Sequence, residues 1–183
     1  MTNRAVFLDR DGTVNEEVSY LSTVEQLTIL HGAAEAIRLL NEHGFKVIII
    51  TNQSGVARGY FSKETLKAIN EHLRAELKKE GAVIDAVYYC PHHPDDGCGC
   101  RKPMTGNIER AEREHDLDLA KSYMIGDTIR DMETGYNAGM KTVLVRTGYG
   151  NDEEKKLSGI SFAPDFIARD LLEAVLWILH GKA

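Results

Sequence analysis

Two aspartates separated by a single residue are the first chemical feature of this chain. Asp9 and Asp11 follow the apolar run of residues 5–8, and Gly12 comes directly after them. Side chains two residues apart in extended backbone share one face, so both carboxylates can enter the same cavity. Two close carboxylates repel unless a divalent cation neutralises them or one of them is protonated. Both conditions suit phosphate-ester cleavage, and an exposed acidic turn is the alternative interpretation of this motif taken alone.

A hydroxyl and a cation appear later in the chain, as phosphoryl transfer requires. Thr51 follows the apolar run of residues 46–50, and Lys102 stands directly before Pro103 in the sequence CRKP. The Thr51 hydroxyl and the amides after it are suited to holding phosphoryl oxygens. Pro103 and the cysteines before Lys102 limit the motion of its ammonium group. Each residue has a plain alternative role, a helix cap or turn for Thr51 and a solvated surface charge for Lys102.

A second pair of acids, Asp127 and Asp131, follows the apolar run of residues 122–125 and begins a segment of helical period. We expect Asp127 to be a metal ligand at the same sheet edge as Asp9. Hard oxygen ligands beside a phosphate favour Mg²⁺. Capping of the helix that follows is the alternative role for Asp131 and for Thr128.

The three cysteines of the chain lie within eleven positions, together with two histidines. Cys90, His92, Cys98 and Cys100 supply three thiolates and an imidazole, which is a tetrahedral Zn²⁺ set. Because four protein ligands leave no open position for water, we predict a structural zinc site. His93 is the alternative to His92 as the fourth ligand. An odd number of cysteines argues against a disulfide framework.

The elements that must position these groups are visible in the hydrophobic pattern. Apolar runs rich in Val and Ile predict strands at residues 5–8, 46–50, 86–90, 122–125 and 142–145. Helical periods predict helices at residues 33–43, 62–79, 106–115, 129–138 and 166–179. This alternation predicts right-handed βαβ crossovers and one doubly wound, Rossmann-like α/β domain over residues 1–183. In such sheets ligands bind at the carboxyl edge, where the motifs above fall. The aperiodic segments 14–30 and 56–61 are candidate substrate gates.

The order of the motifs resembles the haloacid dehalogenase superfamily of phosphatases. Its signature is D-x-D-G-T after strand one, a Thr after strand two, a Lys before a helix and G-D-x-x-x-D after strand four, all found between Phe7 and Asp131. The resemblance implies that Asp9 attacks phosphorus to form an aspartyl-phosphate. It also implies that Asp11 protonates the leaving alcohol and then activates water, while Thr51 and Lys102 stabilise the phosphoryl group.

The same resemblance implies a magnesium site. Its ligands would be Asp9, the backbone carbonyl of Asp11, and Asp127, with Asp131 supporting them from behind. The spacing between the motifs leaves room for the zinc-binding loop and no separate cap domain, so short loops must select the substrate.

The zinc loop running into CRKP resembles the members of this superfamily that act on heptose 1,7-bisphosphate or on histidinol phosphate, and the stretch TNQSGVARGYFS is more similar to the former. This implies removal of the C7 phosphate of a sugar bisphosphate, with histidinol phosphate as the alternative substrate. A zinc-stabilised phosphate-binding module without turnover is the alternative from another class. The implied substrate-binding residues are Glu17, Val18, Ser19, Tyr20, Thr51, Asn52, Gln53, Ser54, Arg101, Lys102 and Thr128.

One position departs from the family pattern. Many members carry Lys directly after the residue equivalent to Asp127, whereas this chain has Thr128. Thr128 itself or Arg130 can replace that substrate contact. The planar guanidinium of Arg101 suits a second phosphate that is held without reaction.

Composition sets the remaining expectations. The chain has 183 residues, 43% of them hydrophobic, and 22 basic against 28 acidic residues give a net charge of −6. This balance lacks the basic stripe of a nucleic-acid-binding protein. The sequence shows neither a signal peptide nor a run long enough for a membrane span, so we expect a cytoplasmic protein. The lack of a coiled-coil pattern favours a monomer.

Overall fold

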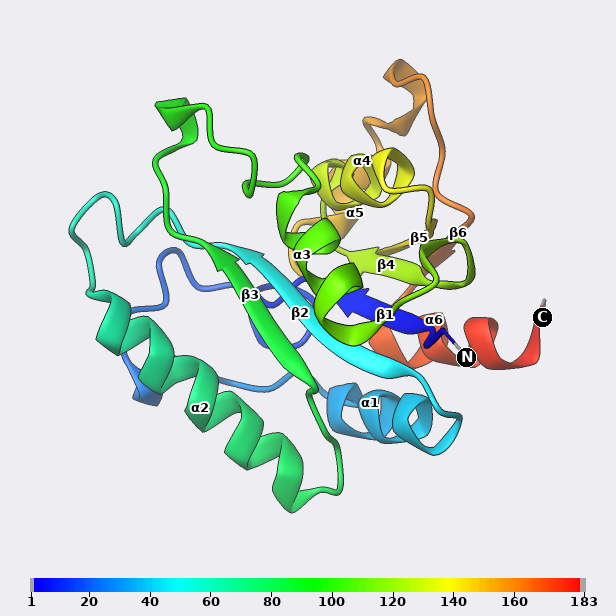
Figure 1. The fold of residues 1–183 in the computed structure, drawn as a ribbon, viewed down its shortest axis with the longest axis horizontal. Coiled ribbons are helices and arrows are strands. Elements are labelled where there is room, and N and C mark those ends of the chain that lie inside the picture. The colour runs from blue at the N-terminus through cyan, green and yellow to red at the C-terminus, as the bar shows by residue number, and fades with distance from the viewer. Residues whose placement is uncertain (1, 182–183) are drawn as a thin grey trace.

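Six short apolar segments form one parallel sheet in the computed structural model, which describes residues 2–181 (Figure 1). The order across the sheet is β3-β2-β1-β4-β5-β6, and each neighbouring pair is parallel. The strands are β1 (Ala5–Leu8), β2 (Lys46–Asn52), β3 (Ala86–Cys90), β4 (Tyr123–Gly126), β5 (Lys141–Val145) and β6 (Phe166–Ala168). From β1 the strand order runs one way through β2 and β3 and the other way through β4, β5 and β6. Doubly wound folds bind ligands at this reversal of strand order. The predicted fold class is confirmed.

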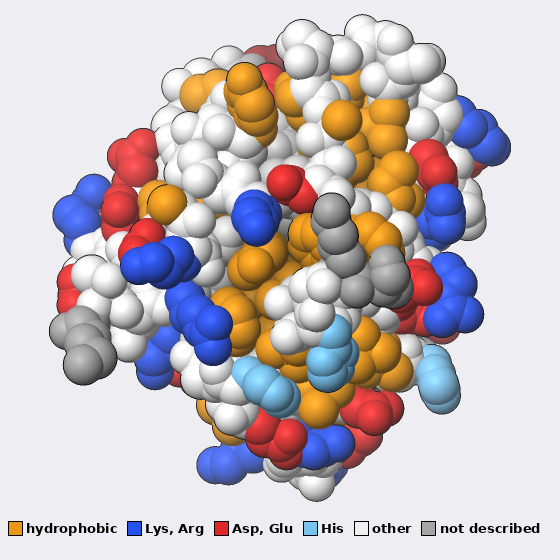
Figure 2. All heavy atoms as spheres, turned by 90° about the vertical axis from the view of Figure 1, so that its right-hand side faces the viewer, with side chains coloured by type: hydrophobic (Ala, Val, Ile, Leu, Met, Phe, Trp, Pro, Cys, Tyr) orange, Lys and Arg blue, Asp and Glu red, His pale blue; other side chains and the backbone are white. Residues whose placement is uncertain are grey.

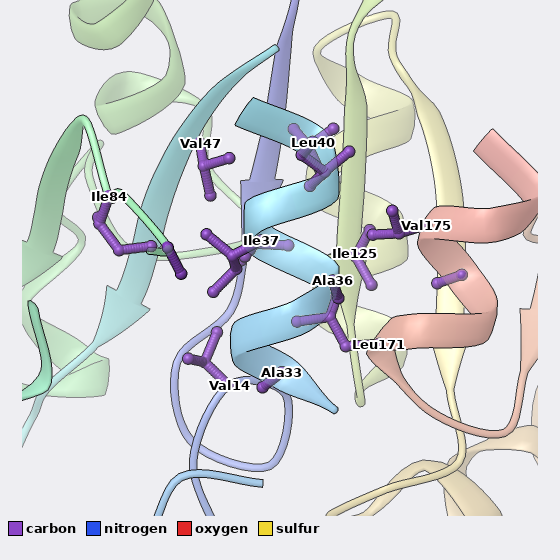
Figure 3. Close-up of a cluster of buried hydrophobic side chains, with 14 of the residues drawn as sticks. Val14, Ala33, Ala36, Ile37, Leu40, Val47, Ile84, Ile125, Leu171 and Val175 are labelled. Carbon is purple, nitrogen blue, oxygen red and sulfur yellow. The ribbon is translucent and has the colours of Figure 1, made fainter. Parts of the chain in front are cut away.

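Helices cover both faces of this sheet, as Figure 1 shows. They are α1 (Ala33–Glu42), α2 (Lys63–Lys79), α3 (Gly106–His115), α4 (Ile129–Asn137), α5 (Gly150–Glu154) and α6 (Leu171–His180). On one face, Ile37 and Leu40 of α1 pack among Val47, Ile125 and Val175, all of them fully buried (Figure 3). The other face is covered by α3 and α4. Because both faces are buried, the strands are almost continuously apolar, in contrast to the alternation of a half-exposed sheet.

The predicted helix over residues 166–179 is wrong at its beginning. Residues 166–168 form β6, in which Ile167 lies opposite Leu144 of β5. The helix starts only at Leu171, because the Asp170 side chain accepts a hydrogen bond from the Glu173 amide at 2.8 Å and so caps α6. The spacing of the apolar residues fits a helix through this region, but it fits a short buried edge strand followed by a capped helix equally well.

Apolar side chains remain partly exposed on α6. Leu176 is 41% exposed, and Trp177 packs in a stacked arrangement on Phe166 with ring centroids 5.0 Å apart. Figure 2 shows apolar side chains gathered on this side of the molecule, near the chain ends. None of the helices within residues 2–181 combines the length and the hydropathy needed to cross a membrane.

Candidate active site

The carboxyl ends of three neighbouring strands bring the predicted chemical groups together. Asp9 follows β1, Thr51 lies in β2 and Asp127 follows β4. Carboxylate oxygens of Asp9, Asp127 and Asp131 lie within 4.8 Å of one another. Parallel strands end at one edge of the sheet, so residues more than a hundred positions apart meet there.

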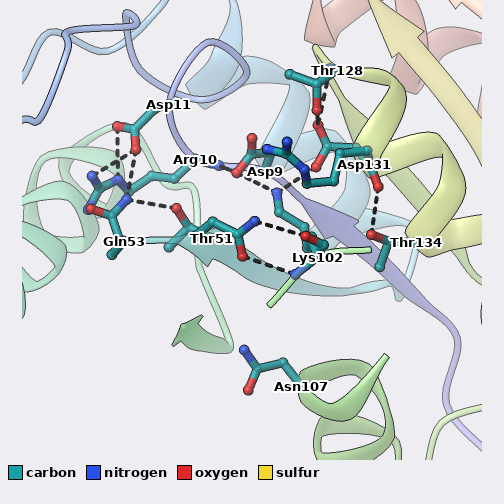
Figure 4. Close-up of polar contacts among 12 residues, drawn as sticks. Asp9, Arg10, Asp11, Thr51, Gln53, Lys102, Asn107, Thr128, Asp131 and Thr134 are labelled. Atoms are coloured by element: carbon teal, nitrogen blue, oxygen red, sulfur yellow. Dashed lines mark hydrogen bonds and ion pairs between the residues drawn. The ribbon is translucent and has the colours of Figure 1, made fainter. Parts of the chain in front are cut away.

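Lys102 is the cation of this cluster. Its ammonium group lies 2.8 Å from Asp9 Oδ1 and 2.5 Å from Asp131 Oδ1, and its side chain is 3% exposed (Figure 4). Burial opposes the positive charge, but the carboxylates of Asp131 and Asp9 hold the pKa of Lys102 above its usual range. The Asn52 side chain fixes the backbone here, since its Oδ1 accepts from the Lys102 amide at 3.0 Å and its Nδ2 donates to the Lys102 carbonyl at 3.2 Å.

Asp131 uses both of its oxygens inside the protein. Oδ1 binds Lys102, and Oδ2 accepts hydrogen bonds from the Thr128 amide at 3.1 Å and the Thr128 hydroxyl at 2.6 Å. Thr128 and Asp131 therefore form the capping box of α4, which was the alternative interpretation of these two residues. By these contacts Asp131 orients Lys102. Because the Thr128 side chain is used in the capping box, Arg130 is the neighbouring cation that lines the central cavity.

Asp127 offers a buried oxygen that a metal ion would use. Its Oδ2 accepts a hydrogen bond from the Tyr149 amide at 2.8 Å, whereas its buried Oδ1 has no hydrogen-bond partner among residues 2–181. Gly12 and Gly148 enclose this carboxylate so closely that a Cβ at either position would collide with Oδ2. Gly12 also has a φ of +82°, a conformation that L side chains rarely adopt.

The electrostatics of the cluster also fit a divalent cation. Burial, reinforced by Asp131 and opposed by Lys102, raises the pKa of Asp9 to about 7. Burial and the neighbouring charges of Asp9 and Asp131 raise the pKa of Asp127 to about 8. The raised pKa values reflect burial and the mutual repulsion of these carboxylates, which a hard cation with oxygen ligands would relieve.

Asp11 lies to one side of this group in a hydrogen-bond network of its own. Arg10 donates from Nε and Nη2 to its two oxygens at 3.1 and 2.9 Å. Asn15 Nδ2 donates to Oδ1 at 2.9 Å, and Gln53 Nε2 donates to Oδ2 at 2.8 Å. Gln53 Nε2 also donates to Thr51 Oγ1 at 2.8 Å, so the Thr51 hydroxyl hydrogen remains available to another acceptor.

Three adjoining cavities open at this edge, and they contain all of the predicted substrate-binding residues. The central cavity, of about 150 Å³, is lined by Asp9, Asp11, Glu17, Thr51, Asn52, Arg101, Lys102, Asp127, Thr128 and Arg130. The polar cavity, of about 250 Å³, is lined by Asp11, Glu17, Val18, Ser19, Tyr20, Leu21, Asn52, Gln53, Ser54, Gly55 and Tyr149. The cationic cavity, of about 450 Å³, is lined by Pro94, Gly97, Cys98, Arg101, Lys102, Pro103, Met104 and Arg130.

The two predicted gate segments meet beside the polar cavity. The rings of Tyr20 and Tyr60 lie edge to face with centroids 4.6 Å apart. Gly55 leaves the space that the Phe61 ring fills, since a Cβ there would collide with that ring. The contact joins the loop after β1 to the loop after β2 at the rim of the site.

The four predicted zinc ligands converge on one another. Cys98 Sγ lies 3.5 Å from Cys90 Sγ and 3.7 Å from Cys100 Sγ, and His92 Nδ1 lies 3.3 Å from Cys100 Sγ. Bonds of about 2.3 Å in a tetrahedron place sulfur ligands about 3.7 Å apart, so this spacing fits Zn²⁺. His93 turns away and accepts a hydrogen bond from the Asp95 amide, which favours His92 as the fourth ligand.

Sequence reasoning missed three parts of the site. Arg10 stands between the two aspartates, where its position gives no indication that it binds Asp11. Asn15 and Tyr149 lie in loops whose conformations no periodicity reveals. The Tyr149 amide bound to Asp127 is a backbone contact, which residue types do not encode.

The amino-acid sequence is similar to a known protein family and to several named enzymes. Residues 99–174 match the HAD-hydrolase-like family model. The D-glycero-D-manno-heptose-1,7-bisphosphate 7-phosphatase of Thermosynechococcus vestitus is 41% identical over 189 residues, which cover 97% of this chain and 96% of the relative. The D-glycero-beta-D-manno-heptose-1,7-bisphosphate 7-phosphatase of Yersinia pestis is 43% identical over 152 residues, which cover 79% of this chain and 81% of the relative.

Solved structures of enzymes with similar names have the same fold as this chain. The crystal structure of D,D-heptose 1,7-bisphosphate phosphatase from B. bronchiseptica, complexed with magnesium and phosphate, has a TM-score of 0.89 and 36% identity, and covers 97% of this chain and 98% of that one. The corresponding enzyme from Burkholderia thailandensis has a TM-score of 0.73 and 28% identity, with coverage of 97% and 99%. Fold and site together therefore define a haloacid dehalogenase-like phosphatase, a phosphomonoesterase. Within that class, the chain belongs to the family of the heptose-1,7-bisphosphate 7-phosphatases.

Proposed function

We propose that this chain hydrolyses the C7 phosphate of D-glycero-D-manno-heptose 1,7-bisphosphate through an aspartyl-phosphate on Asp9, releasing heptose 1-phosphate for the synthesis of nucleotide-activated heptose. The observation that carries the proposal is the arrangement of Asp9. Its Oδ1 is held by the Arg10 amide at 2.7 Å and by Lys102 at 2.8 Å, and Asp9 lines the central cavity, so we assign Oδ2 as the nucleophile. The names of the relatives support the choice of substrate.

The reaction has two steps. In the first, an Asp9 oxygen bonds to phosphorus while the bond from phosphorus to the C7 oxygen breaks, and Asp11 gives its proton to that oxygen. In the second, water loses a proton to Asp11 and bonds to phosphorus, and the bond from phosphorus to Asp9 breaks. The electron pair returns to the Asp9 carboxylate, and inorganic phosphate leaves.

Thr51 and Lys102 stabilise the phosphoryl group. The free hydroxyl hydrogen of Thr51 and the ammonium of Lys102 both reach the central cavity, where charge on the phosphoryl oxygens must be balanced. Asp9, the Asp11 carbonyl and Asp127 would hold Mg²⁺, which supplies positive charge to the same oxygens when bound.

The charges that line the cavities support an assignment for the rest of the substrate. The polar cavity contains Asp11 and Glu17, and burial together with Asp11 raises the pKa of Glu17 above its usual range. A second phosphate is disfavoured beside these acids, whereas sugar hydroxyls can bond to them. The cationic cavity offers Arg101, whose buried Nη1 has no hydrogen-bond partner among residues 2–181, and Arg130. We assign the distal phosphate to these two guanidinium groups, with Arg130 replacing the Lys that Thr128 does not supply.

We further propose that Cys90, His92, Cys98 and Cys100 hold a structural Zn²⁺. Every residue of the loop between β3 and α3 except Lys102 is exposed or half-buried, and the loop contains a single short 3-10 turn, Pro94–Asp96, so it has little apolar core of its own. Zinc binding would supply the missing folding free energy. Since Arg101 and Lys102 follow the last ligand directly, the metal would also fix the two cations that face the phosphates.

The test is Mg²⁺-dependent phosphate release from the α and β anomers of heptose 1,7-bisphosphate and from histidinol phosphate, with Asp9→Asn as the blank. We expect rapid release from one bisphosphate anomer, because Arg101 and Arg130 have no second phosphate to bind in histidinol phosphate. Faster release from histidinol phosphate would refute the assignment of the cationic cavity.

A separate experiment distinguishes an enzyme from a binding module. Beryllofluoride should bind to the wild-type chain and not to Asp9→Asn, as detected by ¹⁹F NMR. Binding of inorganic phosphate without any turnover would instead support the binding module. We also propose that the chain acts as a monomer in the cytoplasm, which size-exclusion chromatography with light scattering and cell fractionation would check.

A further inference from the structure

Arg10 is a fully buried charged side chain for which the two reaction steps above provide no role. Its side chain is 0% exposed. Its Nε and Nη2 groups bind the two oxygens of Asp11, and its Nη1 group donates to Asn70 Oδ1 at 2.9 Å. Asn70 lies in α2 and is itself buried. The guanidinium therefore connects the Asp11 carboxylate to a helix outside the site.

The hydrogen bonds on Asp11 differ in strength. A carboxylate has about four lone-pair positions, and Arg10, Asn15 and Gln53 together donate four hydrogen bonds to them. The paired contacts from the planar guanidinium are charge-assisted and fix the plane of the carboxylate. The amides of Asn15 and Gln53 are neutral and make one contact each. When Asp11 exchanges a proton with substrate or water, we therefore expect one of the amide hydrogen bonds to break and the Arg10 contacts to remain.

Of the two amide contacts, the one from Gln53 lies on the side of Asp11 nearer to Thr51. Gln53 Nε2 lies 2.8 Å from Asp11 Oδ2 and 2.8 Å from Thr51 Oγ1, so one amide group links this oxygen of Asp11 to the hydroxyl assigned to the phosphoryl group (Figure 4). Asp11 also lines both the central and the polar cavity. The ester oxygen must lie where these cavities join, if the phosphoryl group occupies the first and sugar hydroxyls the second.

We propose that Arg10, anchored by Asn70, is a positioning residue that directs Asp11 Oδ2 at the reacting phosphoryl group in both steps. This inference rests on the proposed roles of Asp9 and Asp11. Without the paired contacts only the single amide contacts of Asn15 and Gln53 orient the carboxylate, and proton transfer by a positioned group contributes about 10²- to 10⁴-fold to a rate.

The test uses p-nitrophenyl phosphate beside the heptose bisphosphate. The p-nitrophenolate group leaves without a proton. The value of kcat/KM for p-nitrophenyl phosphate reports only the steps up to formation of the aspartyl-phosphate, so it does not depend on Asp11. The value of kcat includes hydrolysis of the aspartyl-phosphate and does depend on Asp11. For Arg10→Met we expect kcat for this ester to fall about 10- to 100-fold. Its kcat/KM should stay within about threefold, with a matching fall in KM and accumulation of phosphorylated Asp9 in quenched samples.

Asn70→Ala keeps Arg10 and removes its anchor, so it serves if Arg10→Met fails to fold. It should show the same pattern at roughly a tenth of the size, and for both variants kcat/KM for the bisphosphate should fall. Asn41→Ala is the matched control, because the Asn41 side chain likewise ties a helix to the chain, at Val83, far from the site. A proportional fall in kcat and kcat/KM for p-nitrophenyl phosphate, or an unchanged kcat in both variants, would overturn the proposal. If the wild-type chain hydrolyses only p-nitrophenyl phosphate, the substrate proposal fails and this test still stands.

Discussion

Replacing Lys102 by Met should lower both the free energy of unfolding and kcat, and the two losses can be measured independently. The ammonium group of Lys102 is 3% exposed and contacts Asp9 and Asp131 at 2.8 and 2.5 Å. Removal of one partner of a buried ion pair leaves the other charge uncompensated and costs about 3–5 kcal/mol. The two carboxylates can reduce this cost by taking up protons. We therefore expect a loss of about 3 kcal/mol in the free energy of unfolding at pH 8 and a smaller loss at pH 5.

The loss of catalysis should not depend on that stability change. In the proposed mechanism Lys102 is a fixed cation at the phosphoryl group, and removal of one such group typically lowers kcat about 10²- to 10³-fold. Urea unfolding followed by circular dichroism at pH 5 and pH 8 measures the first effect, and phosphate release at saturating Mg²⁺ measures the second. Because a bound divalent cation neutralises Asp9 and Asp127, Mg²⁺ should restore stability in the variant without restoring the rate.

Lys79→Met is the matched control, since Lys79 forms an exposed pair with Glu76 on α2 and surface pairs contribute little. The reasoning would be refuted if Lys102→Met unfolded at pH 8 within about 1 kcal/mol of the wild-type free energy. Retention of more than a tenth of the wild-type rate would refute the assigned contact with the phosphoryl group.

Three further perturbations test neighbouring parts of the site. Gly12→Ala places a Cβ against Asp127 Oδ2 at a φ of +82°, so it should raise the Mg²⁺ concentration needed for half-maximal activity and lower stability by about 1–3 kcal/mol, measured by Mg²⁺ titration and urea unfolding. Removal of the proposed zinc with a chelator, or Cys98→Ser, should lower the thermal midpoint and raise KM for the bisphosphate more than KM for p-nitrophenyl phosphate, because the zinc loop also carries Arg101. Equal changes in the two KM values would contradict this. In the metal-free protein, folded pKa values of about 7 for Asp9 and about 8 for Asp127 lie above the ordinary value of 3.8, so the folded state binds more protons than the unfolded state. Stability should then fall as pH rises from about 4 to 8, and added Mg²⁺ should raise the thermal midpoint more at pH 8 than at pH 5.

Regular elements with a strong pattern were predictable from the sequence. The strand at Ala5–Leu8 and the helix at Gly106–His115 have the predicted bounds, because the first is a continuous apolar run and the second has a clear helical period. The segment at residues 166–179 was not predictable in the same way. Its apolar spacing fits both a helix and a strand followed by a helix, and the cap at Asp170 decides between them.

The candidate site was predictable where residue type carries the chemistry. The acids that follow β1 and β4 and the cysteines and lysine of the loop between β3 and α3 come together as their residue types predicted, and their chemical roles stay predictions. Arg10 is different, because its role depends on a side chain that folds back onto its own neighbour and reaches Asn70 in α2. Such contacts depend on tertiary geometry, which local spacing does not encode.

The position of β1 in the sheet has a consequence for synthesis of the chain. Within residues 2–181 it precedes the other five strands in the chain, and it pairs with β2 on one side and with β4 on the other. A ribosome that has not yet released Tyr123–Gly126 therefore carries a nascent chain in which one edge of β1 is unpaired and apolar. Such edges are sites of aggregation, so we expect the nascent chain to be prone to aggregation until β4 emerges. Pausing of translation within the β1–β4 interval should lower the yield of folded protein more than pausing after it.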